Sequence, residues 1–418
     1  MTVTAGGQNE NRAKVDSATA SFPQTKDDAD DIFVDLHAPE FDLNKHACYF
    51  GTLAKQLPEA YASLGVNKPT VLYFCLSALD LLGKLDLGDQ SKVVEFLYSY
   101  ECFGGASSSQ KGRSEVDGSS EVCQPAGAST DDELFSKGGF LGYKIFCEED
   151  KCECSAQYEF THIANTYTGL MCLVILGDDL SRINRRAVGL QLRQWQQPDG
   201  SFTCAAAPNE KAEGNFVGER DMRFVYCAAV ICALLDLWSY VDVDGMRNFL
   251  LGSRMLDYGF GMFPGTESHG GSTYCALAAL ALMGELHSIQ RPDHMLHWLV
   301  HRMNFGFNGR VNKPADTCYT FWCGSSLGIL GASSMIEPLP ILSFLEQCEF
   351  PRGGFLKTPD NPYPDILHSY YSVCGLSLCG YLENKLSFPF GISERAMEGR
   401  TVHYAKAGDR APFPFDER

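Results

Sequence analysis

Apolar and polar positions form blocks that repeat about every 50 residues from residue 161 onward. Each block opens with a short polar stretch and continues into an apolar segment rich in Ala, Cys, Gly and Leu, which is typical of a buried helix. Tyrosines mark the starts of four of these helices, with spacings of 48, 45 and 52 residues along Tyr226, Tyr274, Tyr319 and Tyr371. A Gly-aromatic turn precedes most of the helices, as at Gly200-Ser201-Phe202, Gly261-Met262-Phe263 and Gly354-Phe355.

A second helix is expected in each repeat, over 181–196, 244–251, 294–303 and 339–348. Before residue 161 the apolar spacing predicts helices over 47–56, 69–82 and 93–100. Two helices per repeat are compatible with an open solenoid or a closed ring. Because the inner helices are small and apolar and polar groups cluster just before them, we predict an all-α fold, an α-α barrel (toroid) of helical-hairpin repeats. The polar ends would then line the mouth of a central cavity.

The repeats point to one domain over residues 41–390, although a length of 418 residues would suggest two or three. Residues 1–40 are poor in aromatics and rich in Ala, Asp, Ser and Thr, which predicts a disordered N-terminal tail. Ser, Gly, Asp and Glu dominate about 104–157, which predicts a flexible insertion. Residues 391–418 follow the last repeat and are expected to be a C-terminal tail.

The formal net charge of −18 argues against a nucleic-acid partner, because phosphate binding needs a basic face. The 17 cysteines are scattered, and the N-terminus lacks the apolar segment of a secretory leader. We therefore expect reduced thiols and a cytoplasmic protein. No apolar run reaches the roughly 18 residues that a membrane-spanning helix needs, so no transmembrane segment is predicted.

Reactive side chains are concentrated in residues 309–322. Pro314 cannot lie inside a helix and Asp316 is a good N-cap, so a helix is expected to begin here. At a helix entry, Asp316 and Cys318 can face one point, and a carboxylate beside a thiolate suggests zinc. His368, just before the fifth inner helix of the repeats, would be the third ligand. Three protein ligands leave one position open for substrate, as in catalytic zinc sites.

Each of these residues also has a purely structural explanation. Asp316 can serve only as a helix cap, Cys318 can fill core, and His368 can be a histidine satisfied near a helix start. A rival metal motif, His294, His297 and His301, lies on one helical face but is expected to be outer surface. Cys147, Cys152 and Cys154 lie beside acidic residues, but their spacing matches no tetrahedral site.

Positive charge is expected at the same mouth, because cationic side chains precede several inner helices. These residues are Arg223, His269, Arg310, Lys313 and Lys357. Repeated positive charge at one place on a protein of net charge −18 fits an anionic ligand, and a diphosphate fits best.

A resemblance to the β subunits of protein prenyltransferases rests on the motif Gly309-Arg310-x-Asn312-Lys313-x-x-Asp316-x-Cys318-Tyr319-x-Phe321-Trp322. Residues 221–227, 267–275 and 364–368 support the resemblance, which runs from about residue 46 to 385. It implies one Zn²⁺ per β subunit and transfer of a prenyl group from its diphosphate to the thiol of a C-terminal CaaX cysteine. It also implies a heterodimer with a helical α subunit, which contributes a further lysine, and CaaX-terminated substrates such as small GTPases.

The resemblance also implies a role for each site residue. Asp316, Cys318 and His368 would bind the zinc. The groups that stabilise the leaving diphosphate would be His269, Arg310, Lys313, Tyr319 and Lys357. The lipid chain would be held by Arg223, Tyr226 and Trp322. The peptide pocket, which favours Leu at the last position, would be shaped by His162, Ala164, Phe224 and Leu367.

Within the family the chain is most similar to the type I geranylgeranyl enzyme. Thr70 stands where the farnesyl enzyme has a bulky tryptophan at the cavity floor, and Phe74 would line the same floor. Lys357 stands where the farnesyl enzyme has an aspartate that binds Mg²⁺, so Mg²⁺ is expected to be dispensable. The alternatives are a farnesyl or Rab-type β subunit, a terpene cyclase, which would need an Asp-rich motif that is absent here, and a non-catalytic helical-repeat scaffold.

Overall fold

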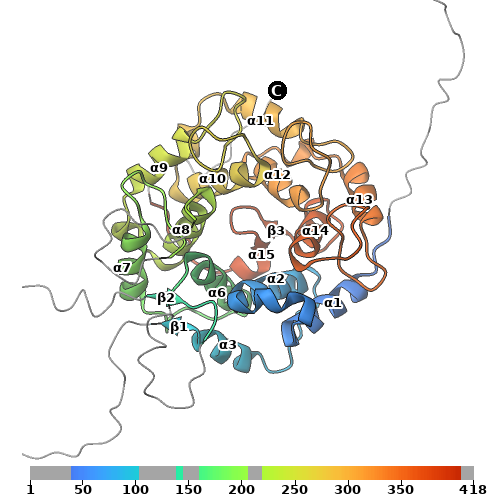
Figure 1. Ribbon diagram of the computed structural model, residues 1–418, viewed down its shortest axis with the longest axis horizontal. Helices are drawn as coiled ribbons and strands as arrows, with labels where there is room; N and C mark the ends of the chain where they lie inside the picture. The colour runs from blue at the N-terminus through green and yellow to red at the C-terminus, as the bar shows by residue number, and fades with distance from the viewer. Residues whose placement is uncertain (1–38, 103–137, 145–159, 206–218, 406–418) are drawn as a thin grey trace, which may run out of the picture. The chain divides into compact units, whose positions relative to one another are not determined.

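The computed structural model describes residues 39–102, 138–144, 160–205 and 219–405, and in this part of the chain an inner set of helices forms a closed ring (Figure 1). Each inner helix packs on the next, and the last packs on the first. In chain order they are α2 (Lys68–Leu81), α6 (Ile163–Ile175), α8 (Met222–Leu235), α10 (Gly270–Met283), α12 (Cys318–Ile329) and α14 (Ile366–Leu378). The predicted all-α toroid is confirmed. The N-terminal tail and most of the predicted insertion lie outside the described residues.

The outer helices alternate with the inner ones around the ring (Figure 1). They are α1 (Leu43–Lys55), α3 (Gln90–Tyr98), α7 (Arg185–Trp195), α9 (Val243–Gly252), α11 (Pro292–Val300) and α13 (Pro338–Gln347). Short 3-10 turns, η1 (Glu59–Asn67) among them, connect some of these helices. The two sets bury different surfaces: α8 is buried all along except at Arg223, whereas α7 buries one side only. Among the described residues, no helix has the length and apolar character that crossing a bilayer requires.

In four of the repeats, a buried phenylalanine lies in the turn that leads from the outer helix toward the next inner helix. The four that form single β-bridges across these turns, all without exposed surface, are Phe202, Phe260, Phe307 and Phe355. The prediction placed Phe263 in this role, but Phe263 is 49% exposed and Phe260, before the glycine, is the buried residue. The turn at Gly306-Phe307 was not among the predicted Gly-aromatic turns. Its glycine lies between an exposed phenylalanine, Phe305, and the buried Phe307.

A ring of phenols inside the barrel surrounds the C-terminal segment. The five tyrosines whose hydroxyls join this network come from five inner helices: Tyr73, Tyr167, Tyr226, Tyr274 and Tyr370. Tyr226 donates to the carbonyl of Pro389 (3.1 Å) and Tyr274 to that of Phe388 (2.9 Å), while Tyr73 and Tyr370 donate to Gly391. Because these carbonyls are satisfied inside the ring, the C-terminal segment is part of the fold.

Residues beyond 390 therefore do not begin a tail, in contrast to the prediction. β3 (Leu386–Ser387) pairs with β4 (Ile392–Ser393), and α15 (Glu394–Met397) follows at once, inside the ring in Figure 1. Residues 138–144 also differ from the predicted insertion. There, β2 (Gly139–Phe140) pairs with β1 (Glu101–Cys102), and Phe140 is fully buried against α6. A single buried aromatic is enough to anchor this short stretch to the core.

The first repeat is joined to the last through His46, which is fully buried on α1. Its Nδ1 accepts a hydrogen bond from the Gly354 amide (3.1 Å), so the proton is on Nε2, which donates to Glu349 (3.0 Å). Burial lowers the pKa of His46 to about 4, and the neutral ring stacks on Phe355 with centroids 4.3 Å apart. This contact holds the turn that precedes α14.

The buried carboxylate of Asp80, at the end of α2, gives a stability prediction. Asp80 is 2% exposed and accepts hydrogen bonds from Ser393 and from Arg395 Nε (2.6 Å). Asp80→Ala should lower the free energy of unfolding by about 2–3 kcal/mol, because it strands a partly buried guanidinium and releases the C-terminal segment. Urea denaturation measures the change. Glu346→Ala, which removes an exposed carboxylate from α13, should leave the midpoint almost unchanged. Equal effects of the two substitutions would contradict this account.

Candidate metal centre and anion site

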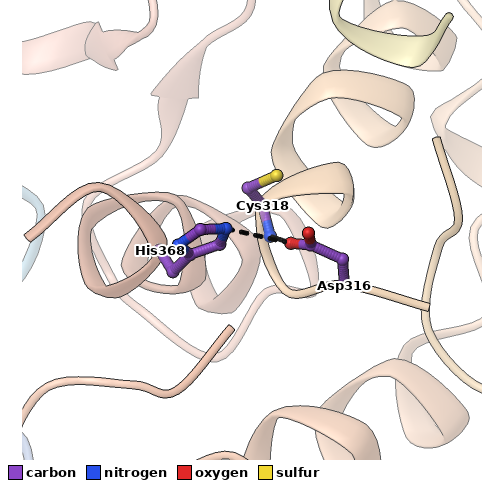
Figure 2. Close-up of side chains that lie close together, drawn as sticks. All are labelled: Asp316, Cys318 and His368. Carbon is purple, nitrogen blue, oxygen red and sulfur yellow. Dashed lines mark hydrogen bonds and ion pairs between the residues drawn. The ribbon is translucent and has the colours of Figure 1, made fainter. Parts of the chain in front are cut away.

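Asp316, Cys318 and His368 come together at the start of α12 and α14 (Figure 2). One ligand atom from each lies within 4.8 Å of the others, and two of the three residues are buried. His368 Nε2 is 3.3 Å from Asp316 Oδ1, about the separation expected of two ligand atoms that each lie about 2.0–2.2 Å from one tetrahedral ion. An imidazole, a thiolate and a carboxylate are the donor types that zinc prefers in proteins. The predicted ligand set is thus brought together, and its geometry fits the metal.

Asp365 sets the orientation of His368. The carboxylate accepts from the His368 backbone amide (2.9 Å) as the N-cap of α14, and its other oxygen lies 2.6 Å from His368 Nδ1. The Nδ1 proton therefore points to Asp365, and Nε2 faces the other two ligands. Burial alone would lower the pKa of His368, but the bonds to Asp316 and Asp365 outweigh it and raise the pKa to about 9. The sequence analysis did not assign this role to Asp365, although its i, i+3 spacing to His368 was a usable signal.

The start of α12 differs from the prediction in detail. The helix begins at Cys318 with Thr317 as its N-cap, and Thr317 makes no side-chain capping bond. Asp316 instead accepts from the Cys318 amide (3.0 Å) from one residue further back. Burial, and then the Asp316 carboxylate, raises the pKa of the Cys318 thiol well above its ordinary value. With its pKa raised in this way the thiol is protonated near neutral pH, and a bound metal ion would favour the thiolate.

Thr317 brings a lysine to the metal cluster. Its amide donates to the carbonyl of Lys357 (3.0 Å) and its hydroxyl to that of Leu356 (3.0 Å). As a result Lys357 Nζ lies 3.7 Å from Asp316 Oδ2, with its side chain half exposed. The sequence analysis placed Lys357 among the diphosphate-binding residues, and a position beside the cluster is compatible with that prediction. Its ammonium is free to turn toward an anion that binds next to the metal ligands.

His269 and Tyr319 form a directed pair of hydrogen bonds. His269 Nδ1 accepts from the Gly271 amide (3.1 Å) as the N-cap of α10, so Nε2 carries the proton and donates to the Tyr319 oxygen (2.9 Å). The Tyr319 hydroxyl proton is then available to a ligand. Burial and the nearby Arg310 lower the pKa of His269, so the ring is neutral. The prediction that His269 adds positive charge is wrong, because its second nitrogen is used as an acceptor by the helix end.

The predicted arginines of the anion site are paired with carboxylates. Arg310 Nη1 lies 3.1 Å from Glu267 Oε2, and both side chains are largely exposed. Arg223 donates to Asp221 through Nε (3.0 Å) and Nη2 (2.6 Å) and to Glu219 (2.5 Å). The site is therefore less basic than its list of cations suggests. A bound anion would have to replace Glu267 on Arg310, an exchange that costs little at an exposed pair.

The predicted peptide residues lie at the same ends of the inner helices. His162 caps α6 by accepting from the Ala164 amide (3.1 Å), and its ring lies edge-on to Phe224 with centroids 6.0 Å apart. Burial lowers the pKa of His162 to about 4, so it too is neutral. Leu367 precedes the metal ligand His368 and is 37% exposed. All four residues thus lie at the starts of α6, α8 and α14, His162 as an N-cap and the others within the first three residues of a helix.

The predicted lipid residues join a larger cluster of aromatic rings inside the barrel. Trp322 packs on Tyr371 (4.5 Å between centroids) and Tyr274 (5.2 Å), and Phe74 reaches Tyr371 at 6.1 Å. Thr70 lies one turn before Phe74 on α2, and its hydroxyl bonds to Asn165 Oδ1 and Thr168 Oγ1 (both 3.1 Å). Tyr274 and Tyr371 were used in the sequence analysis only to count repeats, and the structure shows them to be part of this lining.

The rival motif of His294, His297 and His301 does not form a metal site. His297 and His301 stack with centroids 4.0 Å apart, but His294 turns away and lies against Tyr258. Among the described residues, the Asp316 cluster is the one group of three potential ligands that converge. Cys147, Cys152 and Cys154 lie outside the described residues.

Comparison with known proteins agrees with the fold and the site. The family described as "prenyltransferase alpha-alpha toroid domain" matches residues 41–392. Geranylgeranyl transferase type-1 subunit beta of Arabidopsis thaliana is 34% identical over 81% of this chain and 85% of its own length. The Dictyostelium discoideum protein of the same name is 32% identical over 80% and 89%. In structure, Candida albicans protein geranylgeranyltransferase-I complexed with GGPP aligns over 86% of this chain and 97% of its own, with a TM-score of 0.69 and 23% identity. The chain therefore belongs to the prenyltransferase family of α-α toroids and resembles, within it, the type-1 geranylgeranyl transferase β subunits.

Proposed function

We propose that this chain is the catalytic β subunit of a protein geranylgeranyltransferase of type I. It would transfer a geranylgeranyl group from geranylgeranyl diphosphate to the cysteine thiol of C-terminal CaaX proteins, mostly CaaL. The observation that carries the proposal is the position of the Asp316–Cys318–His368 cluster at the starts of α12 and α14, beside Lys357 and next to Tyr319, the second residue of α12. A thiol-activating metal and a diphosphate-binding group would thus be adjacent, and two relatives of the same kind carry the name of this activity.

In this mechanism one set of residues holds the metal and another set binds the diphosphate. Asp316, Cys318 and His368 would hold one zinc ion, which when bound lowers the pKa of a coordinated thiol and keeps it nucleophilic near neutral pH. The sulfur of the CaaX cysteine forms a bond to C1 of the donor, and the C1–O bond to the diphosphate breaks. Tyr319 donates a hydrogen bond from its hydroxyl group to a diphosphate oxygen, and Lys357 adds positive charge.

The remaining cations would complete the diphosphate subsite. Arg310 exchanges Glu267 for a diphosphate oxygen, and the exposed Lys313 adds a further charge. With lysine at 357, this charge is supplied without Mg²⁺. The prenyl chain would lie along Trp322, Phe74 and Tyr226, whose rings belong to the aromatic cluster inside the barrel. Arg223 would lie beside this chain near the helix ends.

An α subunit is part of the proposal. Loops that precede α10 and α12 expose large apolar side chains, with Leu256 98% exposed, Phe263 49% and Val311 50%. Large apolar side chains at these exposed positions fit an interface with another protein. Buried cysteines of the inner helices, Cys75, Cys172 and Cys227 among them, are free thiols, which supports a reducing, cytoplasmic location.

Zinc affinity tests the metal centre through Asp365. Asp365→Asn keeps an oxygen for the His368 backbone amide but removes the acceptor of the Nδ1 proton. We expect it to weaken zinc binding about 10–100-fold, the usual cost of removing a carboxylate behind a metal-bound histidine. Competition with a chelator on the enzyme co-expressed with an α subunit measures the affinity. Asp360→Asn, an exposed carboxylate in the same loop, is the matched control and should bind zinc normally. A purified wild-type chain that folds without binding zinc would instead support a non-catalytic scaffold.

The hydrogen-bonded pair of His269 and Tyr319 predicts non-additive kinetics. Tyr319→Phe should lower the rate of the chemical step about 100-fold, as the loss of one donor to a developing charge does in other enzymes. His269→Asn retains a side-chain oxygen for the Gly271 amide and removes only the bond to Tyr319, so we expect a smaller loss. The double variant should be no slower than Tyr319→Phe. Single-turnover transfer measures these rates, and additive losses would show that His269 acts on the donor by itself.

Donor choice is predicted to depend on the small side chain at 70. A tryptophan one turn before Phe74 would occupy the space of the fourth isoprene unit, whose burial contributes roughly 3–4 kcal/mol at about 0.8 kcal/mol per CH₂. Thr70→Trp should therefore lower kcat/KM for geranylgeranyl diphosphate and favour farnesyl diphosphate, while Thr70→Ser keeps the wild-type preference. Transfer to a peptide ending in Leu, with and without Mg²⁺, measures both points. Farnesyl transfer that depends on Mg²⁺ in the wild type would assign the farnesyl subtype instead.

A further inference from the structure

Arg302 is a buried cation directly behind the loop that carries Arg310. It follows α11, is 7% exposed, and lies with its guanidinium carbon 5.0 Å from the centre of the Trp298 ring. Its Nε and Nη1 are buried, and neither has a hydrogen-bond partner among the described residues. The buried Oδ1 of Asn308, in the same turn, also has none. A buried guanidinium with unmade hydrogen bonds is costly, so it calls for an explanation.

Arg302 lies one layer behind the His269–Tyr319 pair. The Asn308 amide donates to the Arg302 carbonyl (2.8 Å), and the Asn308 carbonyl accepts from the thiol of Cys323 (3.8 Å). Cys323 lies one turn after Tyr319 on α12. On its other side is the first residue of α10, Gly270, where a Cβ atom would come within 2.8 Å of the Cys323 sulfur and 3.1 Å of the Tyr319 ring.

The other repeats show that the fold does not need a charge at this position. In each of these four turns, one residue comes just before the first partner of the β-bridge. Its carbonyl accepts a hydrogen bond from the backbone amide of the residue that follows the second partner. The counterparts of Arg302 by this criterion are Trp195, Ser253 and Cys348, all of which are fully buried and uncharged. Only the repeat that leads into the Arg310 loop carries a cation here.

No carboxylate neutralises Arg302 by direct contact in the described part of the chain, in contrast to Arg310 and Lys357. Asp257 acts on it electrostatically, but the Asp257 oxygens accept from Ser268 Oγ, the Gly259 amide and Trp298 Nε1. Burial lowers the pKa of Arg302, but a guanidinium keeps its proton at neutral pH. Its charge is therefore offset only in part, by Asp257, and in a region of low dielectric constant the remaining field acts on neighbouring groups such as Cys323.

We propose that Arg302 is a positioning residue for the donor: its fixed, unpaired charge raises the affinity of the site for the diphosphate group. The loop 308–313 connects the turn that holds Arg302 to the exposed Arg310 and Lys313. It needs no reorganisation when the ligand binds, because it exchanges no partner. A buried unpaired cation lowers the stability of the fold, and its contribution to diphosphate binding explains why the chain keeps an arginine here. The inference rests on the proposed function, since it presupposes a diphosphate at this end of α12.

The test separates charge from fold. In the enzyme co-expressed with an α subunit, Arg302→Met should bind geranylgeranyl diphosphate about tenfold more weakly, the order of effect that one unit charge has on a nearby anion at an effective dielectric constant of about 20. Arg302→Lys keeps the charge and should bind nearly as the wild type does. Inorganic diphosphate, titrated in the same calorimetric experiment, should lose as much affinity as the lipid donor, because the effect is on the head group. Zinc content and the KM for the peptide should not change.

Stability supplies the second readout. Arg302→Met removes an unpaired buried charge and should leave the thermal midpoint equal to or above that of the wild type. Arg254→Met is the matched control from the preceding repeat. Arg254 is half-buried and donates to the carbonyls of Tyr258 (3.4 Å), Arg291 (3.3 Å) and Gln290. Its loss should lower the midpoint and leave diphosphate affinity unchanged. Should Arg302→Met prove insoluble, Arg302→Ser, which copies Ser253 of the preceding repeat, replaces it.

Two outcomes would overturn the inference: wild-type diphosphate affinity in the Met or Ser variant, or a Lys variant as weak as Met. A loss confined to the lipid donor, with inorganic diphosphate bound normally, would also overturn it, since the effect would then concern the chain pocket. These results are distinct from failure of the proposed function, in which the wild-type enzyme itself would neither bind nor use a prenyl diphosphate.

Discussion

The site depends on one constraint, that the inner helices of a closed ring run in the same direction. Outer helices return the chain each time, so every inner helix presents its N-terminal end at the same side. Unpaired backbone amides and the positive ends of the helix dipoles therefore collect there. Two of the helices are capped by histidines, His162 and His269, and two by carboxylates, Asp221 and Asp365. The helix ends thus add a positive field at this side of a protein whose net charge is −18, which favours an anion there.

The opposite ends of the inner helices show the complementary arrangement. Carbonyls are left unpaired there, and arginines satisfy several of them. Arg185 donates to Leu235 (3.1 Å), Arg395 to Ile175 (3.1 Å) and Arg400 to Val174 (3.2 Å). Arg395 and Arg400 come from the C-terminal segment, which the phenol ring also holds. The C-terminal segment therefore compensates the negative ends of the ring, while the interior above it stays apolar and aromatic.

The sequence was sufficient for the repeat, the closed ring and the candidate metal cluster, because each depends on residue type and spacing. Periodicity located the inner helices to within a few residues, and three ligand types before adjacent helices predicted Asp316, Cys318 and His368. Spacing misaligned the tyrosines, however. Tyr370, and not Tyr371, joins the phenol ring with Tyr226 and Tyr274. The helix α12 contributes no tyrosine to this ring. Tyr319 is therefore free to meet His269. Which hydrogen bonds a side chain makes depends on its neighbours in space, and for this reason the neutral state of His269 and the pairing of Arg223 were not predictable from residue type.

The same reasoning separates two kinds of cation at the anion site. Arg310 and Lys357 are exposed and paired with Glu267 and Asp316, so each must exchange a carboxylate for the ligand and can recover it afterwards. Such exchange keeps the net affinity moderate and allows an anionic product to leave. A buried cation without a partner behaves differently, because its attraction is the same before and after binding. If both kinds act on one diphosphate, the exposed pairs set how readily it is replaced and the buried charge sets where it rests. The division follows from burial alone, which decides whether water and a carboxylate can reach the cation.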